Sequence, residues 1–170
     1  MRTVSLWAGL LGIEGTTVKT VELDPQGRLR VVVRLRRHEE RRCGICRRRC
    51  PGYDQGDGVR RWRVLDLGAT PAYLEASAPR VRCRRHGVVV AAVPWARHGS
   101  RFSRTFEDQV AWLVTRCDLT AVAELMRIAW RSAGAIIACV THDAERGRDR
   151  LAGLRRIGID EISYGAASVT

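Results

Sequence analysis

Two short motifs in the first half of the chain carry the clearest metal chemistry. Cys43 and Cys46 are separated by two residues, and Cys83 and His86 repeat that spacing, with 36 residues between the pairs. A two-residue gap lets both side chains of a pair turn toward one ion, and thiolate and imidazole suit tetrahedral zinc. The sequence therefore predicts a structural zinc site with these four ligands and no open position for water.

The ligand assignment leaves alternatives open. Cys50 follows the first pair closely in the run CGICRRRC and could replace His86 as the fourth ligand. The four residues could also be unliganded buried thiols with a surface histidine. Cys117 and Cys139 fall on apolar helix faces, so they are interpreted as core residues. The other histidines have no partner at ligand spacing and are interpreted as surface residues: His38, His98 and His142.

Acidic chemistry appears near the end of the chain, in the run GLRRIGIDEISYGAASVT. Asp160 and Glu161 follow an apolar segment with β propensity. They are either the first piece of a metal-binding catalytic centre or part of a polar tail, and both interpretations are open on these residues alone.

The distribution of charge indicates a polyanionic partner. The formal net charge is +12, and 29 of the 30 cationic residues are arginine. Residues 1–100 carry 20 cationic and 9 acidic residues, a net charge of +11, whereas residues 101–170 carry 10 and 9. A codon bias explains arginine over lysine but not this uneven placement. The basic half therefore predicts binding to nucleic acid, because neutralising phosphates releases condensed counterions.

The chain shows no sign of a membrane segment. No stretch approaches the roughly 18 to 20 uninterrupted apolar residues that a spanning helix needs, and its start lacks a cleavage-site pattern. The sequence predicts a soluble, cytoplasmic protein with no membrane partner, and a homodimer is left open.

The first half has the alternation that is typical of strands. The run VKTVELDPQGRLRVVVRLRR predicts a hairpin around Asp-Pro-Gln-Gly. Its second strand would place one row of arginines opposite an apolar row. The runs RRWRVLDLG and AYLEASAPRVRC predict further short strands. We expect a basic β-rich segment over residues 1–42 and a small zinc-ribbon-like sheet over residues 43–98, which needs the metal because its own core is too small.

Helical periodicity follows the β-rich half. Thr105 with Asp108 is predicted to cap the first helix, and two shorter helices are expected at about residues 119–126 and 131–141. Three helices with a short last connection predict a helix-turn-helix unit over residues 99–150. A plain three-helix packing unit is the alternative. The first helix aligns four apolar side chains on one face: Phe106, Val110, Leu113 and Cys117.

Two sets of residues are predicted to contact DNA. The last helix would enter the major groove with Arg131 and Ser132 at the base edges, where arginine can pair bidentately with guanine. The arginines packed around the two cysteine-containing pairs would contact phosphates: Arg41, Arg42, Arg47, Arg48, Arg49, Arg82, Arg84 and Arg85.

In this order the motifs resemble the N-terminal part of ISL-three family bacterial insertion-sequence transposases. The resemblance runs from the basic β-rich start through CGIC, CRRH and PWARHGSRFSRTFEDQVAWLV to RRIGIDEISY, nearly the whole chain up to Tyr164. It implies an α+β chain whose zinc-finger and helix-turn-helix domains precede an RNase H-like catalytic domain, with its first strand in residues 151–170. It also implies that Asp160 is the first of three catalytic carboxylates, which together hold Mg²⁺.

The sequence departs from the family pattern in two places. The second ligand pair is Cys and His where many relatives have two Cys, and GAASVT follows Tyr164 where the family continues into its catalytic domain. We therefore expect a truncated copy that binds double-stranded DNA at the terminal inverted repeats of its element and is inactive alone. Two alternatives are half of an active transposase completed by a downstream frame, and a zinc-ribbon interaction protein with no DNA role.

Overall fold

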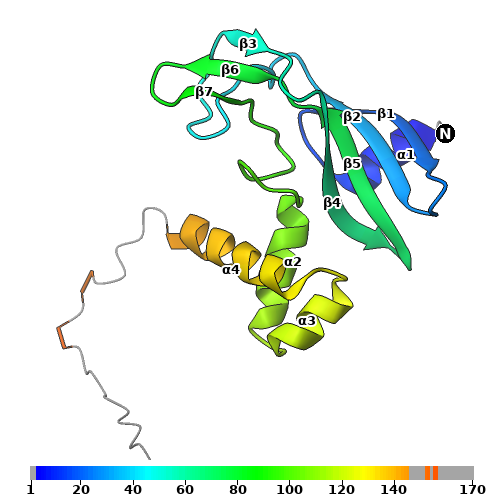
Figure 1. Cartoon of the computed structure of the whole chain (residues 1–170), viewed down its shortest axis with the longest axis vertical. Coiled ribbons are helices and arrows are strands. Elements are labelled where there is room, and N and C mark those ends of the chain that lie inside the picture. The colour runs from blue at the N-terminus through cyan, green and yellow to red at the C-terminus, as the bar shows by residue number, and fades with distance from the viewer. Residues whose placement is uncertain (1–2, 146–151, 154, 157–170) are drawn as a thin grey trace, which may run out of the picture.

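The computed structural model describes residues 3–145, 152–153 and 155–156 (Figure 1). Its chain order mixes strands and helices, which confirms the predicted α+β class. None of the described helices is long and apolar enough to cross a membrane. The elements are α1 (Thr3–Leu11), β1 (Thr16–Leu23), β2 (Leu29–Leu35), β3 (Gly52–Asp54), β4 (Val59–Leu67), β5 (Thr70–Ser77), β6 (Arg80–Cys83), β7 (Gly87–Val90), α2 (Arg104–Val114), α3 (Leu119–Leu125) and α4 (Trp130–Glu145).

A four-stranded sheet in the order β1-β2-β5-β4 forms the largest layer. β1 and β2 make the predicted antiparallel hairpin, whose turn is closed by a hydrogen bond from the Gly27 N–H to the Asp24 carbonyl, 2.8 Å long. β2 pairs in parallel with β5, and β5 pairs antiparallel with β4. The sheet therefore joins strands from residues 1–42 with strands from residues 43–98.

The two faces of this sheet have opposite chemistry. Val31, Leu74 and Trp62 are buried on its inner face, where Trp95 packs edge-on against Trp62 with ring centroids 5.4 Å apart. The alternate residues, pointing outward, are mostly cationic or aromatic: Arg30, Arg34, Arg61, Arg63 and Tyr73. The predicted row of guanidinium groups thus lies on the outer face.

Helix α1 was not predicted, because the first 42 residues were interpreted only as β-rich. Trp7 and Leu11 from this helix pack against the apolar core of the sheet. The helix thus covers apolar surface that a hairpin alone would leave exposed to water.

A second, three-stranded sheet has the order β3-β6-β7 (Figure 1) and adjoins both ligand pairs. Cys83 ends β6, His86 follows in the turn before β7, and Cys43 forms an isolated bridge with Ala91 just after β7. The expectation of one small sheet between those pairs is wrong for β4 and β5. These two strands join the larger sheet because Trp62 and Leu74 complete its core. The small sheet therefore consists of β3, β6 and β7, without β4 and β5.

The helices α2, α3 and α4 pack around Phe106, Val110, Val122, Ala133 and Ile136. Ser103 caps α2, since its hydroxyl accepts the Phe106 N–H at 3.2 Å, so the predicted cap at Thr105 is wrong. Asp118 caps α3 by accepting the Ala121 N–H at 2.9 Å. Cys117 is exposed rather than in the core, because α2 ends before it at Val114.

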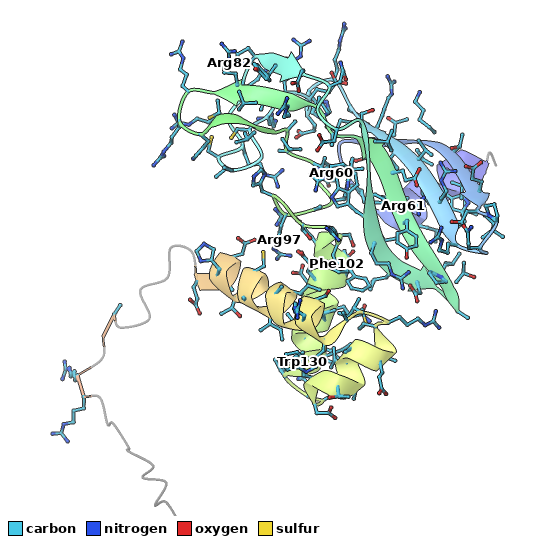
Figure 2. The ribbon with its side chains drawn as sticks, in the orientation of Figure 1. Arg60, Arg61, Arg82, Arg97, Phe102 and Trp130 are labelled. Carbon is cyan, nitrogen blue, oxygen red and sulfur yellow. The ribbon has the colours of Figure 1, made fainter. Side chains whose placement is uncertain are left out.

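Residues 91–103 connect the sheets to the helices. Trp95 and Ala96 are buried in the core of the four-stranded sheet, and the Ser103 N–H donates to the Arg63 carbonyl at the edge of β4. Between them, Arg97 turns to the helical unit and bonds α2 and α4 (Figure 2). The orientation of the helices is therefore tied to the sheet.

Candidate zinc site and nucleic-acid surface

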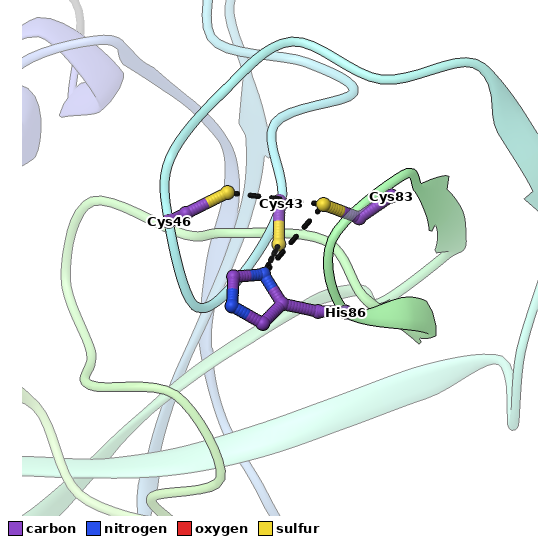
Figure 3. Close-up of side chains that lie close together, drawn as sticks. All are labelled: Cys43, Cys46, Cys83 and His86. Carbon is purple, nitrogen blue, oxygen red and sulfur yellow. Dashed lines mark hydrogen bonds between the residues drawn. The ribbon is translucent and has the colours of Figure 1, made fainter.

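The structure brings the four predicted metal ligands together (Figure 3). Their ligand atoms all lie within 4.8 Å of one another, and no other group of this kind occurs in the part of the chain that the structure describes. The Cys46 and Cys83 sulfurs are 3.8 Å apart, and His86 Nδ1 lies 3.5 Å from Cys43 Sγ and 3.6 Å from Cys83 Sγ.

These separations fit a tetrahedral zinc ion. With Zn–S bonds of about 2.3 Å and a Zn–N bond of about 2.0–2.1 Å, tetrahedral angles put two sulfurs about 3.8 Å apart and sulfur and nitrogen about 3.6 Å apart. The three distances above agree with this geometry. The donor set of three thiols and an imidazole also suits zinc.

Local hydrogen bonds prepare one thiol for a cation. The Arg85 backbone N–H bonds the Cys83 sulfur and lowers the pKa of that thiol to about 6, against the opposing effect of burial. Burial raises the pKa of the Cys43 thiol. A bound cation would favour the thiolate at both positions, because metal binding displaces the thiol proton.

Burial and a contact with the Cys83 thiol raise the pKa of the fourth thiol near the site, Cys50. Cys50 is buried in the same small core, but it is not a member of the group of four, and its Sγ bonds the Arg48 carbonyl at 3.4 Å. His86 thus belongs to the group of four, and Cys50 lies next to that group through its contact with Cys83.

The backbone around the first pair is tightly held. The Arg47 N–H donates to the Cys43 carbonyl at 2.9 Å, and Arg47 adopts a left-handed φ of 60°, a position more often taken by glycine. Its guanidinium reaches the Val93 carbonyl at 3.1 Å. Arg47 thus fastens the motif to residues 91–103.

The predicted phosphate contacts divide into two groups. Arg42 and Arg47 are half-buried and bond backbone carbonyls, Arg42 reaching those of His38 and Arg47 at 3.4 Å. The others are exposed around the metal site: Arg41, Arg48, Arg84 and Arg85. Arg49 and Arg82 are exposed too, and the Arg82 guanidinium lies 5.0 Å from the Tyr53 ring (Figure 2).

The predicted base-contacting residues lie at the start of α4. Arg131 is exposed and Ser132 is half-buried. The neighbouring Trp130 was missed, although it is 63% exposed in the first position of the helix. The sequence signal for this residue was a tryptophan directly before Arg131, a predicted base contact.

The turn between α3 and α4 has a left-handed residue that is not glycine. Arg127 has a φ of 53°, and its guanidinium donates to the Ala69 carbonyl at 2.9 Å and to Asp66 at 3.2 Å. Arginine thus occupies a position that glycine often takes in such turns, and its side chain fastens the turn to the β4–β5 connection. Asp160, the predicted catalytic acid, lies outside the described residues.

A metal-binding ribbon followed by three helices with this short last turn defines a zinc-ribbon and helix-turn-helix protein. Residues 39–86 match the family model described as the zinc-finger of transposase IS204/IS1001/IS1096/IS1165. Residues 91–138 match the helix-turn-helix domain of transposase family ISL3. The chain therefore carries the N-terminal zinc-ribbon and helix-turn-helix domains of ISL3-family transposases.

Two relatives extend this similarity across the chain. Each is a transposase for insertion sequence element IS1557 from Mycobacterium tuberculosis, one from strain CDC 1551 / Oshkosh and one from strain ATCC 25618 / H37Rv. Both are 52% identical over 170 residues, covering 96% of this chain. The chain spans 38% of the length of these relatives. No solved structure matches the chain.

Proposed function

We propose that this chain binds double-stranded DNA at the terminal inverted repeats of its insertion element. The observation that carries the proposal is the exposed start of α4, where Trp130 and Arg131 project from a helix-turn-helix unit. In that motif the N-terminal residues of the second helix face base edges in the major groove. Arg131 would read a guanine, and Trp130 would supply apolar contact to a thymine methyl group.

The zinc ribbon would contribute contacts that do not depend on base sequence. Zinc held by Cys43, Cys46, Cys83 and His86 would fix the turn that presents Arg84 and Arg85. Exposed arginines of this kind neutralise phosphates and set the position of a protein on the duplex. Asp160 would hold Mg²⁺ in strand transfer only together with the other carboxylates of the family's catalytic set.

A fluorescence anisotropy titration tests the proposal with two labelled duplexes, one carrying the terminal repeat and one with the same bases shuffled. We expect tighter binding to the repeat at the same salt concentration. Arg131→Ala should reduce the discrimination by about 1–3 kcal/mol, whereas Arg84→Ala should weaken binding to both duplexes alike. Equal affinity of the unaltered chain for the two duplexes would contradict sequence-specific binding.

A further inference from the structure

A groove of about 320 Å³ lies between the outer face of the four-stranded sheet and the turn that leads into α4. Four of its nine lining residues are arginine and none is acidic. The arginines come from β4, from the segment before α2 and from the α3–α4 turn: Arg61, Arg63, Arg101 and Arg127. We call this surface the arginine groove. Its positive charge is assembled from parts of the chain that are far apart in sequence.

Two of the arginines build the groove itself. Arg63 is 8% exposed, bonds Asp66 at 2.5 Å and lies 5.2 Å from the Tyr73 ring. Arg127 bonds Asp66 and the Ala69 carbonyl. Their guanidinium groups are held in place by these partners, so they give the groove a fixed shape.

The other two arginines are available to a ligand. Arg61 is exposed on the sheet (Figure 2), and its guanidinium bonds one carboxylate oxygen of Glu75, which also binds Arg30. Arg101 is exposed, and its side chain has no ion pair or hydrogen bond among the residues that the structure describes. Glu75 and Glu22 balance Arg30 and Arg61. Arg63 and Arg127 share the single carboxylate of Asp66, and Arg101 has no carboxylate partner among the described residues, which leaves excess positive charge at the surface.

The groove adjoins the start of α4, because Ser132 contributes to its lining beside Arg131. A helix in the major groove lies between two phosphate backbones, since that groove is only about 12 Å wide. We propose that the arginine groove binds backbone phosphates of the same duplex whose base edges face Arg131. The four-stranded sheet then belongs to the DNA-binding surface, together with the zinc ribbon and the helices. This inference rests on the proposed function.

The salt dependence of DNA binding tests the inference on the full chain. Each phosphate contact contributes about 0.9 to the slope of log K against log salt concentration on duplex DNA. Arg101→Gln should lower the magnitude of that slope by about 0.9, and Arg61→Gln with Arg101→Gln by about 1.8, equally on repeat and shuffled duplexes. Arg101→Lys keeps the charge and should retain the slope.

Lys19→Gln is the matched control, because Lys19 is an exposed cation on β1 at the opposite edge of the sheet. It removes the same charge and should leave the slope within about 0.3 of the unaltered value, since it contacts no phosphate. A double variant that keeps the unaltered slope, or a control that loses as much slope as Arg101→Gln, would overturn the inference. If the chain does not discriminate between the two duplexes, the salt slopes on the shuffled duplex still test whether Arg61 and Arg101 contact phosphates.

Discussion

Gly44 shows how a single residue constrains the metal site. It is buried between Cys43 and the second ligand of the pair, with an ordinary backbone conformation. A Cβ added there would lie 2.5 Å from the Val90 carbonyl oxygen and in direct contact with His98 Nδ1. The glycine is therefore required by the close approach of residues 90 and 98, because a side chain has no space.

We predict that Gly44→Ala destabilises the chain by about 1–3 kcal/mol, the usual cost of overpacking, and weakens zinc binding. His98 can rotate away, but the Val90 carbonyl belongs to the backbone of β7. Gly134→Ala is the control, since Gly134 has open space around it in α4 and the change should stabilise that helix by up to about 1 kcal/mol. Urea unfolding measures the stability of the two variants, and zinc titration measures their affinity for the metal. Equal effects of the two changes would contradict the steric explanation.

At the scale of elements, the metal is predicted to act on the small sheet. The core beneath β6 and β7 has five buried residues, of which three are cysteines, whereas the four-stranded sheet buries thirteen. Structural zinc contributes about 10–16 kcal/mol to folding in zinc-finger peptides, far more than the two non-cysteine members of this small core, Val81 and Ala91, can supply. The larger sheet has an apolar core of its own, so it is predicted to fold without the metal.

Chelation of zinc, or Cys83→Ser, should therefore unfold the β3-β6-β7 sheet and leave the larger sheet folded. Hydrogen exchange measures this directly, with loss of protection over residues 80–90 and retained protection in β2 and β5. Cys50→Ser is the control and should retain zinc, because Cys50 is outside the group of four. Loss of zinc from Cys50→Ser would show that Cys50 is a ligand.

Three strands of the large sheet are predicted to be linked by a pH-dependent contact: β2, β4 and β5. Glu75 on β5 is 6% exposed and accepts hydrogen bonds from Arg30 at 2.8 and 3.1 Å and from Arg61 at 2.8 Å. Burial alone would raise the pKa of Glu75, but the hydrogen bonds from Arg30 and Arg61 lower it below its ordinary value. The contact therefore stabilises the sheet above the unfolded-state pKa and is lost as the pH falls through the folded-state pKa.

Glu75→Gln should lower stability by about 1.5–3 kcal/mol near neutral pH, the range for hydrogen bonds to a charged group, and the difference should disappear in acid. Unfolding by urea at a series of pH values measures it. Glu22→Gln removes an exposed carboxylate that pairs with Arg30 at 2.8 Å and should cost at most about 1 kcal/mol. A pH-independent difference for Glu75→Gln would contradict the electrostatic account.

At the scale of the whole molecule, Arg97 couples the sheet to the helices. Its side chain is 10% exposed and bonds Glu107 at 2.6 Å, Asp108 at 2.8 Å and Asp143 at 2.7 Å. Burial would lower the pKa of Arg97, but these three carboxylates raise it. Because Ala96 is in the sheet core and Asp143 is on α4, the residue next to Ala96 joins the sheet core to the helices through its side chain.

Arg97→Met should destabilise the chain by about 3–5 kcal/mol, because Glu107 would remain buried without its cation. Adding Glu107→Gln should recover part of that loss, since it removes the buried charge. Thermal and urea unfolding report the change, and Arg116→Met, at an exposed residue that stacks on Trp112, is the control. An unchanged unfolding midpoint for Arg97→Met would exclude this coupling.

Local patterns were enough to predict several features of this protein. Ligand spacing identified the residues that meet at the metal site, alternation identified the β1–β2 hairpin, and the helical period identified α2, α3 and α4. These patterns involve residues close together in the chain, so they can be recognised without knowledge of the tertiary structure. The distribution of charge and the order of the motifs could also be recognised from the sequence. The family comparisons agree with the motif order, since the zinc-finger match precedes the helix-turn-helix match.

Only the tertiary structure decided which surfaces these parts form. Pairing of β2 with β5 depends on apolar faces more than forty residues apart in sequence, so no local pattern showed that β4 and β5 leave the zinc ribbon. Folding also separates Arg42 and Arg47, which bond carbonyls, from Arg61 and Arg101, which meet at the groove. The sequence by itself determined which four predicted ligands meet and the sign of the charge. The placement of that charge required the fold, because it depends on which arginines find internal partners.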